Sequence, residues 1–201
     1  MFFKQIKHVG DNFSYIIADE TSKEAAVVDP SFNATAIIQF ANKQNFRIKY
    51  IINTHHHRDH TEGNERIKST LNSKIVAHKQ SRNAKDIAVD EGEILKVGGI
   101  SVKVLHTPGH TPDSNCLLID RKLLTGDTLF IGECGRTDIS GGNSKDMYYS
   151  LNKLKKLDDD IKIYPGHDYG VKPHSTIGEE KQTNYTLEKR SLKEFIEFMK
   201  E

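Results

Sequence analysis

A dense cluster of metal-ligand side chains occupies residues 54–60, which read Thr-His-His-His-Arg-Asp-His and hold four of the chain's ten histidines. Neutral imidazole offers a nitrogen lone pair near neutral pH, which makes histidine the commonest protein ligand for metals. The cluster follows the apolar residues 50–52. Polar rings at the end of a strand cannot fill a core, and clustered imidazoles repel one another once protonated. Only a cation makes such a cluster favourable, so the sequence predicts a metal site here.

The spacing within the cluster indicates which side chains converge. Alternate residues of an extended or tightly turning chain point the same way, so His55 and His57 should converge while His56 points elsewhere. Asp59 and His60 follow on the next turn of chain. There they are positioned either for a second cation or for holding the first ligands in place.

Three further candidate ligands lie later in the chain, each in a turn-rich loop after an apolar segment. They are His110, Asp127 and His167. Loops at one edge of a rigid sheet are where binding residues usually collect, because the sheet fixes their positions. Counting the histidine cluster, the order strand, turn, ligand recurs four times. We expect these four loops to meet at one sheet edge and to form one metal centre.

The succession of these residues, from the histidine cluster to His167, resembles the metallo-β-lactamase superfamily over nearly the whole chain. The resemblance implies an α/β (α+β) fold of the αββα sandwich type. In it, two mixed β-sheets face each other, helices flank them and the metal lies at one edge. Residues 125–131 (Thr-Gly-Asp-Thr-Leu-Phe-Ile) and 134–136 (Cys-Gly-Arg) are similar to the branch shared by glyoxalase II, a thioester hydrolase, and the persulfide dioxygenases, which oxidise glutathione persulfide.

The residues after Cys134 help to separate the two members of this branch. Residues 135–139 (Gly-Arg-Thr-Asp-Ile) are similar to the dioxygenase pattern, whereas glyoxalase II continues with an aromatic pair and Glu-Gly. Asp168 also favours the dioxygenases, because glyoxalase II more typically has Glu there. Gly166 favours glyoxalase II, since some dioxygenases have Ala at this place. The resemblance favours a persulfide dioxygenase-like enzyme, with a glyoxalase II-like hydroxyacylglutathione hydrolase as the alternative.

The resemblance implies a different metal arrangement for each activity. In the dioxygenase, one Fe(II) is held by His55, His110 and Asp127, and the other candidates orient these ligands and retain water. In the hydrolase, two cations, zinc or a mixed pair, activate water for attack on the thioester. Their ligands would be His55, His57 and His110 for the first, Asp59, His60 and His167 for the second, and Asp127 as the bridge.

Substrate contacts are expected from two residues near these ligands. Arg136 can donate a bidentate pair to a carboxylate, such as the glycine end of glutathione, and the resemblance supports that role. Tyr169 can point its hydroxyl at bound oxygen or sulfur, and together with Asp59 it is a catalytic candidate. The alternatives are a surface arginine and a half-buried loop tyrosine. We expect the remaining histidines to be structural or exposed: His8, His78, His106 and His174.

Composition excludes several classes of function. With 29 basic and 28 acidic residues and a net charge of +1, the chain has no basic field to attract nucleic acid. No stretch approaches a membrane span. The two cysteines, Cys116 and Cys134, are too far apart in sequence for a chelating pair. We expect a cytoplasmic enzyme with a small-molecule thiol substrate, such as a glutathione derivative, and a single domain over residues 1–201. A homo-oligomer remains open.

A non-catalytic metal-binding protein is the third reading. Structural zinc sites are usually four-coordinate, closed and dominated by Cys and His. The seven candidate ligands include no cysteine and exceed what a closed site needs. The sequence therefore disfavours this reading.

The pattern of apolar residues predicts alternating strands and helices. Strands are expected at 2–6, 13–18, 25–28, 48–52, 74–77, 94–97, 100–105, 116–119 and 122–125. Helices are expected over 35–43 with Asn33 as N-cap, from about 61–63 onward, over 145–156 and over 191–199. The residues Gly98-Gly99 should make a tight turn. Asp113 replaces a glycine common in the resembling family, which Asp accommodates in part by tolerating a left-handed backbone.

Overall fold

Two six-stranded mixed sheets form the centre of the computed structural model, which describes residues 1–200. The N-terminal sheet has, in spatial order, β1 (Phe2–Lys7), β2 (Phe13–Ala18), β3 (Glu24–Val28), β4 (Arg47–Ile52), β5 (Lys74–His78) and β6 (Ile87–Val89). The C-terminal sheet has β12 (Ser175–Thr176), β11 (Lys162–Pro165), β10 (Lys122–Gly126), β9 (Asn115–Ile119), β8 (Ile100–His106) and β7 (Ile94–Val97). The pairs β3–β4, β4–β5, β5–β6 and β10–β11 are parallel, and the other pairs are antiparallel.

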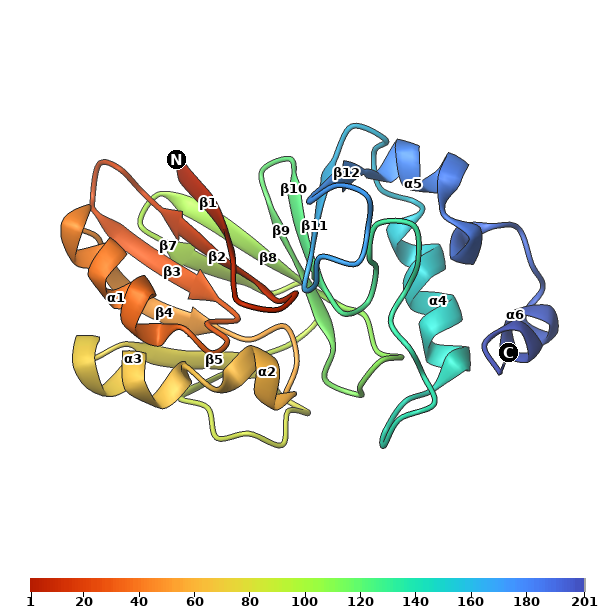
Figure 1. Cartoon of the computed structure of the whole chain (residues 1–201), viewed down its shortest axis with the longest axis horizontal. Coiled ribbons are helices and arrows are strands. Elements are labelled where there is room, and N and C mark those ends of the chain that lie inside the picture. The colour runs from red at the N-terminus through yellow and green to blue at the C-terminus, as the bar shows by residue number, and fades with distance from the viewer. Residues whose placement is uncertain (201) are drawn as a thin grey trace.

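Helices cover the outer face of each sheet (Figure 1). Near the N-terminal sheet lie α1 (Ala34–Lys43), α2 (Arg58–Thr61) and α3 (Asn64–Leu71). On the other side lie α4 (Ser144–Leu154), α5 (Ile177–Thr183), the 3-10 helix η1 (Tyr185–Leu187) and α6 (Leu192–Phe198). The layers are therefore helix, sheet, sheet, helix, and the αββα sandwich expected from the sequence is confirmed.

The burial of β2 shows how the sequence specifies these layers. Phe13, Tyr15 and Ile17 point into the cluster between the two sheets, while Ile16 and Ala18 join the cluster beneath α1 and α3. Successive side chains of a strand point to opposite faces, so a strand covered on both faces is apolar throughout. This double burial fixes the register of β2 and holds the neighbouring strand ends in place.

The predicted elements agree with the structure except around the histidine cluster. Asn33 caps α1, its side chain accepting a hydrogen bond from the backbone N–H of Ala36, as expected. The helix expected to begin near 61–63 is present as α3, but the short helix that precedes it was not expected. The chain already turns into α2 at Arg58, and α3 begins at Asn64 after a break at Gly63. A Cβ on Gly63 would lie 2.9 Å from the Ser31 carbonyl oxygen, so close packing explains this glycine.

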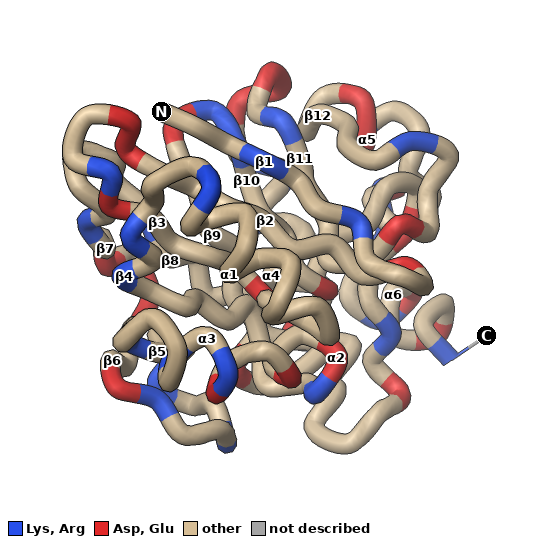
Figure 2. Tube along the Cα trace, turned by 60° about the vertical axis from the view of Figure 1, so that its left-hand side comes forward, with Lys and Arg blue, Asp and Glu red and all other residues tan. Residues whose placement is uncertain are grey.

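Charged residues of both signs are interspersed over the trace (Figure 2), as the nearly balanced composition leads one to expect. Within residues 1–200, no helix combines the length and the apolar character that crossing a membrane requires.

Candidate metal centre

Three imidazoles from two loops meet at one point. His55 and His57 come from the loop after β4, and His110 comes from the loop after β8. His57 Nδ1 lies 3.0 Å from His55 Nε2 and 3.1 Å from His110 Nε2. Three ligands about 2.0–2.1 Å from one ion would be separated by about 3.0–3.4 Å. These residues, here called the first triad, have the spacing of a shared ion.

A second group of ligand atoms lies beside the first. Asp59 and His60 belong to α2, and His167 follows β11. His60 Nε2 is 3.1 Å from His167 Nε2 and 3.3 Å from Asp59 Oδ2. His167 Nε2 and Asp59 Oδ2 are 3.4 Å apart. Asp59, His60 and His167 form the second triad.

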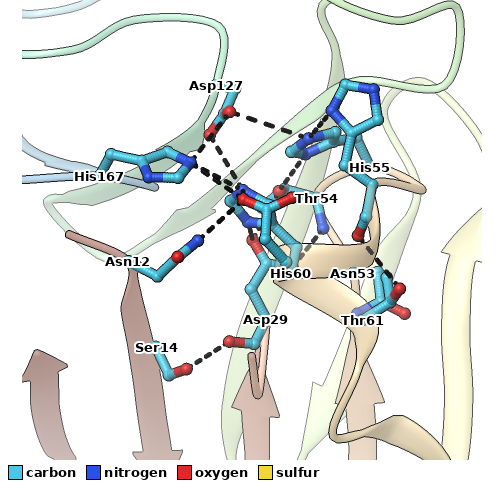
Figure 3. A network of polar contacts seen from close by, with 12 residues as sticks. Asn12, Ser14, Asp29, Asn53, Thr54, His55, His60, Thr61, Asp127 and His167 are labelled. Carbon is cyan, nitrogen blue, oxygen red and sulfur yellow. Dashed lines mark hydrogen bonds and ion pairs between the residues drawn. The ribbon is translucent and has the colours of Figure 1, made fainter. Parts of the chain in front are cut away.

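Asp127, directly after β10, lies close to members of both triads, and Figure 3 shows it beside His55, His60 and His167. Its Oδ1 is 3.3 Å from His60 Nε2, and its Oδ2 is 3.3 Å from His167 Nε2 and 3.5 Å from His110 Nε2. Oδ1 is buried and has no hydrogen-bond partner among residues 1–200. A buried carboxylate oxygen in this state is costly. A bound cation would satisfy it, so the residues present fit a metal ion.

The two triads differ in their electrostatics. Burial lowers the pKa of His57 to about 4 and lowers that of His55 well below its usual value, so these rings are neutral, as metal ligands must be. Burial acts in the same direction on His60 and His167, but the carboxylate of Asp127 outweighs it. The pKa of His60 is raised, and that of His167 is raised to about 10, with Asp59 adding to the effect. The second triad therefore demands positive charge, which a metal ion would supply in place of protons.

Outer hydrogen bonds set the orientation of the imidazoles. Asp29, at the end of β3, accepts from the Thr54 backbone N–H at 2.8 Å, the Thr54 hydroxyl at 2.6 Å and His60 Nδ1 at 3.0 Å (Figure 3). The Thr54 hydroxyl in turn accepts from His55 Nδ1 at 3.1 Å. Since Nδ1 donates in both rings, Nε2 of each keeps its lone pair toward the centre.

His110 and His167 are oriented in the same way. His110 Nδ1 donates to the Arg136 carbonyl oxygen at 2.9 Å, and His167 Nδ1 donates to Asp11 Oδ1 at 3.1 Å. Asn12 donates its amide to Asp59 Oδ2 at 3.0 Å. Four of the five imidazoles in the two triads thus have an outer acceptor. The fifth, His57, has none for its Nε2 within residues 1–200.

One glycine is needed for the close approach of the second triad to Asp127. A Cβ on Gly166 would lie 2.3 Å from Asp127 Oδ1 and 2.9 Å from His60 Cε1. Neither atom belongs to the first triad. Gly166 therefore leaves room on the side of the centre where a second cation would lie.

A model of the metallo-beta-lactamase superfamily matches residues 9–86 and 79–167, which together contain both triads and Asp127. The chain belongs to the metallo-β-lactamase superfamily. This superfamily binds metal ions, and the two triads are clusters able to hold them.

The relatives of the chain within the superfamily include enzymes of several kinds, two of which bear on its function. It is 37% identical over 169 residues to a hydroxyacylglutathione hydrolase of Pelagibacter ubique, covering 82% of this chain and 70% of that protein. It is 33% identical over 196 residues to human mitochondrial persulfide dioxygenase ETHE1, covering 95% and 77%. The crystal structure of ETHE1 from Myxococcus xanthus superposes with a TM-score of 0.95 at 31% identity, covering 100% of this chain and 90% of that one. The chain spans only 63–70% of the length of the first hydroxyacylglutathione hydrolases that it matches.

The two predicted substrate contacts lie near the metal centre but differ in orientation. The Tyr169 ring stacks on His167 with centroids 4.8 Å apart and an interplanar angle of 7°, and Tyr169 is 51% exposed. The Arg136 side chain is 66% exposed, and its guanidinium makes a bidentate pair with Asp138 at 2.7 Å for both bonds. Arg136 contacts the first triad through its backbone carbonyl, which accepts from His110, and not through its guanidinium.

His56 points away from the centre, as expected from the alternation. Its Nδ1 donates to Asp113 Oδ1 at 2.6 Å. The explanation offered for Asp113 from the sequence, a left-handed backbone, is wrong, because Asp113 is not among the residues with positive φ. Its carboxylate instead pairs with His56 and accepts from the Thr111 hydroxyl at 2.8 Å.

The other histidines lie outside the two triads. His8 is buried and bonds to Ser14 at 2.6 Å, and His174 is exposed. His78 and His106 stack with centroids 3.9 Å apart. The expectation that these four are structural or exposed agrees with their positions.

Sequence reasoning missed the residues that support the ligands: Asp11, Asn12, Asp29 and Thr54. A signal for Asp29 was present. It directly follows β3, which is parallel and adjacent to β4, so its side chain had to lie beside the histidine loop. For Asp11 and Asn12 there was no signal, because only the isolated bridge between Asn12 and His167 brings their loop to the centre.

Proposed function

We propose that the protein is a cytoplasmic persulfide dioxygenase-like enzyme that oxidises glutathione persulfide, or a similar small persulfide, with O2 at one Fe(II). The observation that carries the proposal is the superposition with the Myxococcus xanthus ETHE1 structure over the whole chain. The similarity to human persulfide dioxygenase ETHE1 over 196 residues supports the same activity. Relatives of both kinds are enzymes, which disfavours a non-catalytic metal protein.

In this proposal His55, His110 and Asp127 hold the iron, a two-histidine, one-carboxylate set that leaves positions open. The iron supplies the redox chemistry between O2 and sulfur that no side chain can provide. Asp127 is held in place because Thr128 N donates to Thr125 O, closing the turn around it at 3.0 Å. His57, Asp59, His60 and His167 orient these ligands and retain water.

The thiol carrier has room beside Tyr169. A cavity of about 400 Å³ is lined by Tyr169, Ile131, Glu133 and Tyr185 among others. Because Tyr169 also stacks on His167, a carrier in this cavity would place its sulfur toward the metal centre. We infer that Tyr169 lines the passage from the carrier cavity to the metal centre and directs its hydroxyl to the reacting atoms.

A thioester hydrolase with two cations, zinc or a mixed pair, is the second candidate. The observation that favours it is the second triad around the unpartnered Oδ1 of Asp127, with Gly166 leaving room there. In this arrangement each triad holds one ion and Asp127 bridges them. The ions would supply a water activated near neutral pH.

Metal content and activity together separate the two candidates. Protein purified without oxygen should contain about one iron per chain if the open two-histidine, one-carboxylate set is correct. It should consume O2 with glutathione persulfide and leave a lactoyl-glutathione thioester intact. Two zinc ions per chain, rapid thioester hydrolysis and no O2 consumption would contradict the dioxygenase proposal and support the hydrolase.

Arg136→Ala tests the substrate contact. If the guanidinium binds a substrate carboxylate, kcat/KM should fall roughly ten- to hundredfold, mainly through KM, because the contact is made equally in the ground and transition states. Metal content should stay unchanged, since His110 bonds to the Arg136 backbone. Asp138→Asn is the matched control: it frees the guanidinium from its present partner and should not raise KM. Unchanged kinetics of the alanine variant would show that the Arg136 side chain does not bind the substrate.

A further inference from the structure

His57 differs from the other imidazoles of the two triads in how it is supported. Its Nδ1 faces the other two members of the first triad, His55 and His110. Its Nε2 lacks an outer acceptor among the residues that the structure describes. It is also the only half-buried imidazole of the first triad. His57 is a ligand in the two-cation arrangement and orients His55 and His110 in the one-iron arrangement. In both cases a ring without an outer partner must lose rotational freedom when metal binds, which weakens metal affinity. The position of His57 must therefore be set through its backbone.

Its neighbour His56 has the acceptor that His57 lacks. His56 Nδ1 donates to Asp113 Oδ1 at 2.6 Å, and the Asp113 side chain is only 1% exposed. The second oxygen, Oδ2, is buried with no hydrogen-bond partner among residues 1–200. A buried carboxylate oxygen without a partner is costly, so the bonds that Oδ1 accepts from His56 and the Thr111 hydroxyl must offset that cost.

The pair joins the two loops that supply the first triad. His56 lies between two of its members, and Asp113 lies three residues after His110. The backbone on the His56 side is held as well: Asn83 donates to the His56 carbonyl at 2.8 Å, and the Thr61 hydroxyl donates to that of His57 at 3.1 Å. With both peptide groups fixed, a short ionic hydrogen bond at His56 determines where His57 projects.

We propose that His56 and Asp113 are positioning residues for the metal centre, which fix His57 and tie its loop to that of His110. This inference rests on the proposed function only in requiring that the first triad binds metal. It predicts that the pair tightens metal binding without touching the ion. The pair takes the place of the direct outer hydrogen bond that the other four imidazoles have.

Zn²⁺ affinity of the metal-free protein, measured by competition with a coloured chelator, tests the pair. Asp113→Asn and His56→Ala should each weaken binding of the tighter ion roughly 10- to 100-fold, the usual effect of removing an outer partner. The double variant should be no weaker than His56→Ala alone, because that substitution already removes the hydrogen bond that Asp113→Asn weakens by removing the charge of the acceptor. His56→Asn should recover part of the loss, since its amide can donate from nearly the place of Nδ1.

Two controls separate positioning from general damage. Glu180→Gln also converts a buried, hydrogen-bonded carboxylate to an amide, but its partners are Gly132 and Asn184, so Zn²⁺ affinity should be unchanged. The melting temperature of each metal-free variant reports folding by itself. Parent-like Zn²⁺ affinity in His56→Ala and Asp113→Asn, additive losses in the double variant, or an equal loss in Glu180→Gln would overturn the inference. A parent protein that binds no Zn²⁺ would instead remove the metal centre on which the proposed function rests, and this inference with it.

Discussion

Asp127→Ala should abolish metal binding and activity together. Its carboxylate is within 3.9 Å of a ligand nitrogen of His55 and closer still to three other imidazoles, so it contacts both triads. Removing it should cost more than the roughly 10- to 100-fold loss of affinity typical of an outer partner. His110→Ala should behave likewise, because the first triad then keeps two imidazoles. Elemental analysis of the purified variants measures the effect.

An exposed aspartate provides the control for this substitution. Asp158 is 75% exposed and contacts only Arg121 among the charged groups of residues 1–200, so Asp158→Ala should keep the metal content of the parent. Full metal retention in both Asp127→Ala and His110→Ala would disprove the assignment of the centre, whichever reaction it catalyses.

Asp29→Asn should weaken both metal binding and folding. An asparagine tolerates the positive φ of 47° at this position, so the backbone should be preserved. Its amide nitrogen, however, would face a donor, because both carboxylate oxygens now accept hydrogen bonds from Thr54 and His60. A buried donor left unsatisfied costs about 1–3 kcal/mol of folding free energy.

The metal affinity of Asp29→Asn should fall roughly 10- to 100-fold, because the rings of His55 and His60 lose their orientation. Urea denaturation of the metal-free protein measures the first effect, and chelator competition measures the second. Asp19→Asn offers a comparison, since Asp19 also accepts several hydrogen bonds but lies in a turn far from both triads. An Asp29→Asn protein with the stability and metal affinity of the parent would show that Asp29 does not support the centre.

The convergence of the candidate ligands could be predicted because each lies in a loop that follows an apolar strand of the sequence. Parallel strands such as β3, β4 and β5 end at the same edge, so local patterns already specify where their loops meet. Asn33 was predictable for the same reason, since capping depends only on the next few residues. Features that depend only on residues a few positions apart can therefore be predicted from the sequence alone.

Contacts between distant loops could not be predicted. The bond between His56 and Asp113 joins residues 57 positions apart, and that between Asp11 and His167 joins residues 156 apart. The direction of the Arg136 guanidinium could not be predicted either, because side-chain rotamers determine whether it pairs with Asp138 or with a substrate. Residue types reveal which groups can bind, whereas the partner of each group depends on the packing of the whole fold.

The candidate ligands are divided between the two sheets. Asp59 and the histidines up to His60 follow β4 of the N-terminal sheet, whereas His110, Asp127 and His167 follow strands of the C-terminal sheet. An ion shared by both sets would cross-link the two halves of the sandwich as a disulfide would, joining residues 53 positions apart at the first triad and 107 positions apart at the second. Loss of the metal would then lower the stability of the sandwich itself, and rebinding would restore it. The supply of metal would therefore affect how long the chain stays folded as well as its catalysis.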